Sequence, residues 1–158
     1  MREFTGRGPA LRRLDRGARV VYSAFLVFLL VGLATAGLLH WDGMGATAAG
    51  ATTYWRGDEP AMVYPKSFRQ ILEVTHFHLF TEPVVWLVVA HLYHMGGGRG
   101  LVSLGTLGAI ALQIALPWCV SYVSPVFGAL FLPVTAGVVL GLAWMIVDSL
   151  REMWSSRS

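Results

Sequence analysis

The histidines are the residues of this sequence best suited to bind a metal ion or a cofactor. The chain contains five of them, namely His40, His76, His78, His91 and His94. A neutral imidazole nitrogen can ligate a transition metal or a haem iron, and an imidazole can also pass a proton. All except His40 fall in one largely apolar segment, residues 74–95. This segment is therefore the first place to look for a functional site.

The spacing of the histidines divides them between faces of a helix. At about 100° per residue, His76, His91 and His94 share one face. His78 lies on a different face, together with Glu82 four residues later. A rise of about 1.5 Å per residue separates the two histidine pairs by roughly 20–25 Å. In a membrane-spanning helix, one pair would lie near each membrane surface.

The composition indicates that such helices cross a membrane. The chain is 55% hydrophobic and 13% charged, whereas a soluble domain has about 25% charged residues. Segments long enough to span, with no charged residue, lie at 20–39, 101–123 and 126–147. The segment 74–95 is a fourth, more polar candidate. We predict one all-α membrane domain over residues 1–158, a four-helix bundle with an outer loop at 40–66.

Basic residues predict the orientation of this bundle. Six arginines precede the first span: Arg2, Arg7, Arg12, Arg13, Arg16 and Arg19. Such clusters remain on the cytoplasmic side of a bacterial cytoplasmic membrane, so four spans place both termini there. Beside a span, this cluster indicates an anchor at a lipid surface rather than a nucleic-acid site. The twenty-residue apolar run after it exceeds the about 7–15 residues of a signal peptide, which makes cleavage the less favoured reading.

Antiparallel packing would bring histidines from two spans to one depth. His40 ends the first span on the outer side, and His76 and His78 begin the second span there. Two imidazoles from facing helices can serve as the axial ligands of a b-type haem. Glu73 or Glu82 could orient a ligating histidine through its other ring nitrogen. The pattern leaves open whether His76 or His78 is the ligand.

Histidines at both ends of one membrane helix resemble the four-helix membrane b-type cytochromes. In that group, two helices each carry an upper and a lower histidine, which bracket two haems. The resemblance covers residues 74–95 and His40, and it implies haem b and electron exchange with quinone or a partner redox protein. This sequence departs from the pattern because no second helix carries a lower histidine. His91 or His94 would need a partner such as Met145 or a second protomer.

Other functions fit parts of the same pattern. Glu73, His76 and His78 could bind a non-haem metal, as could His91 and His94, but residues two apart on a helix point in different directions. Glu82 near the middle of a span could handle protons. A cofactor-free accessory or assembly subunit of a membrane complex is a further alternative. No nucleophile–base pattern or nucleotide-binding loop is present, so we assign no catalytic residue.

Small residues predict where spans pack closely. Gly137 and Gly141 form a small-xxx-small motif on the last span, and Gly105 and Gly108 suggest close approach on the third. Packing within the monomer and packing in a homodimer both fit these glycines.

Overall fold

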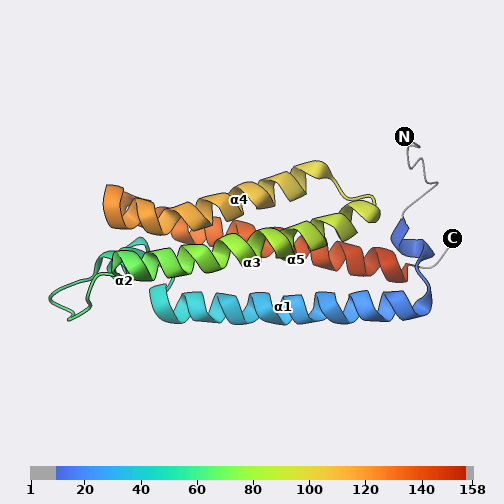
Figure 1. Ribbon diagram of the computed structural model, residues 1–158, viewed down its shortest axis with the longest axis horizontal. Helices are drawn as coiled ribbons and strands as arrows, with labels where there is room; N and C mark the ends of the chain where they lie inside the picture. The colour runs from blue at the N-terminus through green and yellow to red at the C-terminus, as the bar shows by residue number, and fades with distance from the viewer. Residues whose placement is uncertain (1–9, 156–158) are drawn as a thin grey trace.

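The computed structural model describes residues 10–155 as a set of long helices lying side by side (Figure 1). The elements are η1 (Ala10–Arg13), α1 (Arg16–Met44), α2 (Ala48–Arg56), α3 (Phe68–Met95), α4 (Gly100–Trp118), η2 (Cys119–Val123), η3 (Pro125–Leu130) and α5 (Phe131–Trp154). The long helices are α1, α3, α4 and α5. The short helix α2 covers one end of the bundle, which we call the α2 end, and η1 lies at the opposite end.

Three helical segments are long and apolar enough to cross a membrane: Arg16–Met44, Gly100–Val123 and Pro125–Trp154. They contain the spans predicted at 20–39, 101–123 and 126–147. Large apolar side chains on their outer faces are exposed, among them Phe28 on α1 and Leu140 on α5. In a bilayer these side chains contact lipid. The described residues therefore form a helical membrane protein.

The helix α3 is continuous over the fourth predicted segment but more polar than the other three. Ser67 caps its start, as the sequence suggests: the Ser67 hydroxyl accepts from the Gln70 N–H, and the Gln70 side chain accepts from the Ser67 N–H. The helix then continues through Pro83 to Met95. It carries the predicted histidine segment 74–95 on one uninterrupted element.

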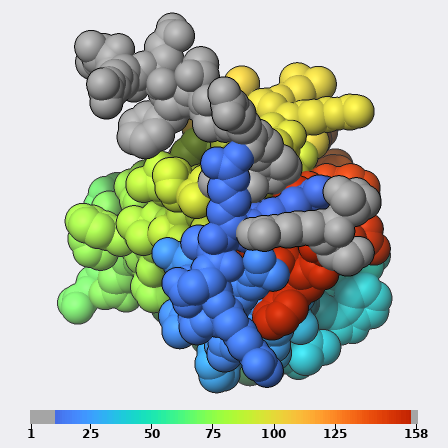
Figure 2. Space-filling view, turned by 90° about the vertical axis from the view of Figure 1, so that its right-hand side faces the viewer, coloured from blue at the N-terminus to red at the C-terminus, as the bar shows by residue number. Residues whose placement is uncertain are grey.

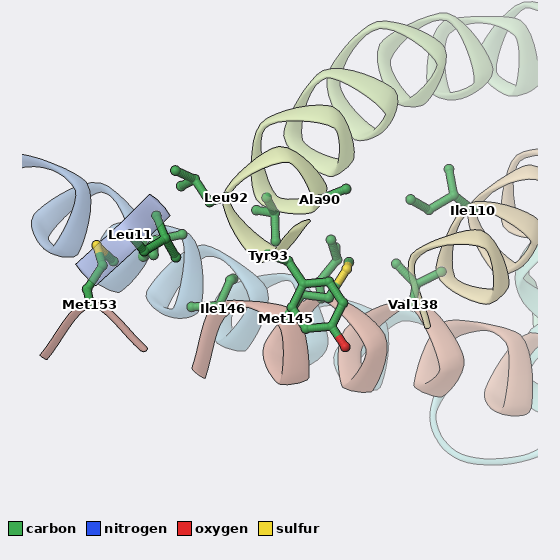
Figure 3. Close-up of a cluster of buried hydrophobic side chains, with 12 residues drawn as sticks. Leu11, Ala90, Leu92, Tyr93, Ile110, Val138, Met145, Ile146 and Met153 are labelled. Atoms are coloured by element: carbon green, nitrogen blue, oxygen red, sulfur yellow. The ribbon is translucent and has the colours of Figure 1, made fainter. Parts of the chain in front are cut away.

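The main apolar core lies toward the η1 end of the bundle. Leu26, Tyr93, Ile110 and Met145 bring α1, α3, α4 and α5 together there, and Leu11 of η1 covers them. Figure 3 shows Tyr93 and Met145 within this cluster. Met145 is fully buried. Its thioether is part of the core, on a different side of α3 from the exposed His91 and His94.

Arginine side chains connect neighbouring segments at the η1 end through an ion pair and hydrogen bonds. Arg12 of η1 forms an ion pair with Glu152 near the end of α5, and the Arg19 side chain donates to the carbonyl of Leu14. Figure 2 looks onto this end, where η1 (blue) lies beside the end of α5 (red). Of the predicted basic cluster, Arg2 and Arg7 lie outside the described residues.

The glycine motif of the last span packs inside the monomer. A Cβ on Gly141 would meet Thr106 of α4, with the two Cβ atoms 3.1 Å apart, and one on Gly137 would meet Ala109 at 3.5 Å. For Gly105 and Gly108, close packing within the monomer is wrong, because neither has a neighbour within 4 Å of such an added atom. The interface with α5 uses the next residues, Thr106 and Ala109, which lie about 100° further round the helix.

At the α2 end, α2 docks on the connection between α4 and α5. The Arg56 side chain donates to the carbonyl of Val120 (3.1 Å), and the Thr52 hydroxyl lies 3.2 Å from the carbonyl oxygen of Pro125. A Cβ on Gly128 would lie 2.8 Å from the carbonyl oxygen of Ala48, so only glycine allows this approach. This docking positions the side chains of α2 over the end of the bundle.

Candidate functional site

A cavity of about 580 Å³ lies inside the α2 half of the bundle. Residues of α1, α3, α4 and α5 form its walls, and Tyr54 and Trp55 of α2 close its end. Most of the lining is apolar. Its volume falls within the roughly 300–1,000 Å³ typical of small-molecule and cofactor sites. The cavity is therefore large enough to hold an organic ligand at membrane depth.

Two histidines line this cavity from different helices. His40 reaches it from α1, and His78 reaches it from α3. Both side chains are half-buried. His76 does not line the cavity: it is exposed, and its ring lies against Phe80, with the two ring centroids 4.9 Å apart. The structure thus separates the two neighbouring histidines that the sequence left as alternatives, and of the two only His78 lines the cavity.

A hydrogen-bonded network holds His78 in place. Its Nδ1 lies 2.8 Å from Oε1 of Glu82, and Nε2 of Gln113 on α4 donates to the same oxygen at 2.9 Å. Because a carboxylate only accepts hydrogen bonds, the tautomer of the uncharged ring that fits this contact has its proton on Nδ1. The other nitrogen, Nε2, then carries a free lone pair. A carboxylate behind a histidine in this way is a common support for a metal-ligating imidazole.

The same network leaves buried polar atoms without partners. Among the described residues, Oε2 of Glu82 and Oε1 of Gln113 have no hydrogen-bond partner, nor does Nε1 of Trp55. All three residues line the cavity. Buried unpaired polar atoms are costly, and they commonly mark a place where a ligand, water or ion completes the hydrogen bonding. Unpaired polar atoms of three cavity-lining residues therefore lie buried in the wall around the cavity.

Glu73 has a different partner from the one predicted. It pairs with Arg69 one turn earlier on α3, with Nε and Oε1 2.8 Å apart, and both side chains are well exposed. It contacts neither His76 nor His78 through any hydrogen bond in the described structure. Of the two carboxylates proposed to orient a histidine, Glu82 is the one in position to do so.

His94 forms hydrogen bonds across the turn between α3 and α4. Its Nδ1 lies 3.2 Å from the carbonyl oxygen of Gly98, and its Nε2 lies 2.9 Å from the hydroxyl of Ser103. With both ring nitrogens occupied, His94 is poorly placed to ligate a metal. His91 is exposed on α3. Residues 10–155 contain no group of three or more His, Cys, Asp or Glu side chains arranged to hold a metal ion, whereas a haem needs only two axial side chains.

Sequence reasoning missed Gln113 and Trp55. Gln113 is a side-chain amide in the middle of a charge-free span, which is an unusual place for one and was a usable signal. Trp55 lies in the segment 40–66 that the sequence predicted as an outer loop. Its position over the cavity depends on how α2 docks, which no local pattern indicates.

Comparison with known proteins gives one match. The model of a protein family described as a transmembrane helical domain matches residues 45–158. This region includes His78, Glu82 and Gln113, and it excludes His40. No curated protein and no solved structure matches the chain.

Proposed function

We propose that this chain, which belongs to a family of transmembrane helical domains matched over residues 45–158, is a haem b electron-transfer protein of the membrane. The observation that carries this proposal is that His40 and His78, from two different helices, line one apolar cavity. The pair supplies one imidazole from each of two helices, and two imidazoles are the axial ligands that a bis-histidine haem uses. His76, His91 and His94 are then outside the site.

The proposal includes α3 as a fourth membrane span. The helix is long enough, since it covers 28 residues and about 20 suffice. It also packs against α4 and α5 and runs along the length of the bundle (Figure 1). The arginines Arg12, Arg13, Arg16 and Arg19 gather at the η1 end, which supports a cytoplasmic position for that end in a bacterial cytoplasmic membrane. The α2 end then lies on the outer side.

The residues around the cavity fit the needs of a haem. When bound, the haem supplies a one-electron carrier. Glu82 accepts a hydrogen bond from the Nδ1–H group of His78. This bond orients the ring and makes Nε2 a better metal ligand. Gln113 holds Glu82 in that position. The mostly apolar lining suits the porphyrin ring, and quinone or a partner redox protein would exchange electrons with the site.

A second candidate function uses the same network without a haem. Glu82 and His78 are titratable groups in contact inside the bundle, and Oε2 of Glu82 is buried without a partner. Such a pair can pass a proton when a ligand or water completes it. This supports proton handling as the alternative. A cofactor-free accessory subunit would leave the network with a purely structural role.

The test is an absorbance spectrum of the protein purified from a haem-sufficient host. We expect sharp reduced-minus-oxidised bands that survive chelators, and we expect His40→Ala and His78→Ala each to abolish the low-spin signal. His76→Ala is the matched control, since it removes the same side chain two residues away on the same helix, and its spectrum should be unchanged.

Three results would contradict this assignment. A wild-type protein without haem bands leaves proton handling or the accessory role, and stoichiometric metal without those bands indicates a non-haem site. Loss of the bands in His76→Ala, with His78→Ala silent, would place the ligand on the other face of α3.

A further inference from the structure

The cavity between the helices reaches the outer surface on one flank of the bundle. Most residues that line it are buried or half-buried, but Leu39 of α1 and Phe77 of α3 are 74% and 63% exposed. Gly32 and Ala36 of α1 also line the cavity and are exposed. Within residues 10–155, the exposed lining residues all belong to α1 and α3. Residues that belong to both the cavity wall and the outer surface mark an opening, which we call the flank mouth.

The position of Phe77 on α3 gives the direction in which the flank mouth faces. Thr75 and Glu82 each accept a hydrogen bond from a side chain of α4. Viewed along the helix, they lie about 40–60° from His78 in one direction, whereas Phe77 lies about 100° from His78 in the other. The helix α1 packs against α5 and α2. The flank mouth therefore opens away from α4, between α3 and α1, and this flank faces lipid when both helices span the membrane.

Buried side chains close the two ends of the same cavity. At the α2 end, Trp55 is buried and its ring stacks on that of Phe131, with the ring centroids 6.0 Å apart. Tyr54 packs edge-on against Trp55, at 5.0 Å between centroids. Toward the η1 end, the cavity is lined by Leu142 and Ile146 of the main core, which are also buried. A ligand therefore finds the exposed part of the wall on the lipid-facing flank and not at the water-facing ends.

Two glycines of α1 leave space beside the flank mouth. Gly32 and Gly37 line the cavity, and a Cβ added to either would meet nothing within 4 Å. Neither glycine therefore allows a close approach of another described helix. Glycine within a helix costs about 0.5–1 kcal/mol relative to alanine. What the missing side chains provide at these positions is room in the cavity and its mouth.

Resting on the proposed function, we infer that the flank mouth admits a quinone dissolved in the bilayer, and that this quinone is the redox partner. Leu39 and Phe77 directly precede the two proposed haem ligands, His40 and His78, so a molecule in the mouth lies next to the ligand pair. A quinone is a redox carrier that dissolves in lipid, and its flat ring can stack on the ring of Phe77. A water-soluble redox protein would meet the closed α2 end instead.

Photolabelling in liposomes tests this site. The probe is a quinone that carries a decyl chain and an azido group, and labelled peptides are mapped by mass spectrometry after irradiation. We expect label on α1 and α3 near Leu39 and Phe77, displaced by excess unlabelled decylquinone but not by decanol. Gly32→Leu and Gly37→Leu fill the open space and should each lower this labelling severalfold. Gly108→Leu on α4 is the matched control, because that glycine also has open space beside it but does not line the cavity.

Two labelling results would overturn the inference. Equal labelling in Gly32→Leu and Gly108→Leu would place the quinone elsewhere, and displacement by decanol as effective as that by decylquinone would indicate a site for lipid chains. In the haem-loaded protein, decylquinol should also reduce the haem more slowly in Gly32→Leu than in Gly108→Leu. Labelling itself requires no haem. Displaceable label without haem bands would therefore refute the cofactor and keep the quinone site, whereas haem bands without displaceable label would refute the quinone site alone.

Discussion

Replacing Gly141 with alanine should destabilise the contact between α4 and α5, whereas replacing Gly137 should not. The two glycines belong to the same motif and differ by one turn of α5, but they meet different neighbours. A new Cβ at position 141 would lie 3.1 Å from both Cβ and Cγ2 of Thr106, and closer still to its hydroxyl. A new Cβ at position 137 would meet only Ala109, at an ordinary contact distance of 3.5 Å.

The expected magnitude follows from these distances. Inserting a methyl into a filled interface costs about 1–3 kcal/mol. Thr106 cannot turn aside freely, because its hydroxyl donates to the carbonyl of Val102 at 2.9 Å, and losing that bond costs about 0.5–1.5 kcal/mol. Alanine gains about 0.5–1 kcal/mol over glycine within a helix. Gly141→Ala should therefore lose about 1–2 kcal/mol of unfolding free energy in total, and Gly137→Ala should be neutral or slightly stabilised.

Thermal unfolding of the purified protein in detergent measures the difference. For a chain of this size, we expect Gly141→Ala to lower the Tm by roughly 2–8 °C. Thr106→Ala combined with Gly141→Ala removes the hydroxyl and the methyl that the new Cβ would meet. The double variant should therefore lose less than the sum of the two single variants. If Gly137→Ala loses as much as Gly141→Ala, the two helices meet through another face, and the reasoning is wrong.

Two further predictions concern the cavity and the topology. Gln113→Leu removes the amide that donates a hydrogen bond to Glu82 and should lower the unfolding free energy by about 1–3 kcal/mol in the same unfolding assay. Leu112→Ala, at the exposed neighbouring position, is the control. An unchanged stability for Gln113→Leu would mean that Glu82 does not depend on this bond. A reporter inserted after Ala61, in the exposed loop before α3, should be active only outside the cytoplasm. A reporter fused after Ser158 should be active only inside the cytoplasm. If both reporters are active on the same side, α3 is eliminated as a span.

The four long helices and their approximate limits could be predicted from the sequence, because long apolar runs and helix caps are local signals. The prediction of a loop at 40–66 was wrong in part, because this segment contains the end of α1 and the short helix α2 (Ala48–Arg56). Ser67 illustrates this, since its side chain caps α3 where the sequence places the helix start. The division of the histidines between two faces was also correct, as His78 lines the cavity and His76 does not. Which face points inward was not predictable. In a membrane helix both faces are apolar, so hydrophobic periodicity does not separate lipid from core.

The remaining differences between the sequence predictions and the structure also arise because the sequence does not show which face of a helix points inward. Gly105 and Gly108 were expected at a close contact, but a small residue fits a lipid-facing position equally well. Met145 was considered as a ligand because of its depth, yet depth does not give the direction of a side chain, and this one is buried in the core. Gln113 joins the site only through the packing of α4 on α3. Contacts between distant segments depend on how whole helices are rotated, which no short motif encodes.

The docking of α2 also sets an order of events during biosynthesis. Thr52 contacts Pro125, 73 residues later, and Arg56 contacts Val120, 64 residues later. During synthesis α2 therefore leaves the ribosome well before the surface it rests on exists. Tyr54 and Trp55 can close the end of the cavity only after the connection between α4 and α5 has been made and inserted. Until then, this end of the cavity has no wall from α2.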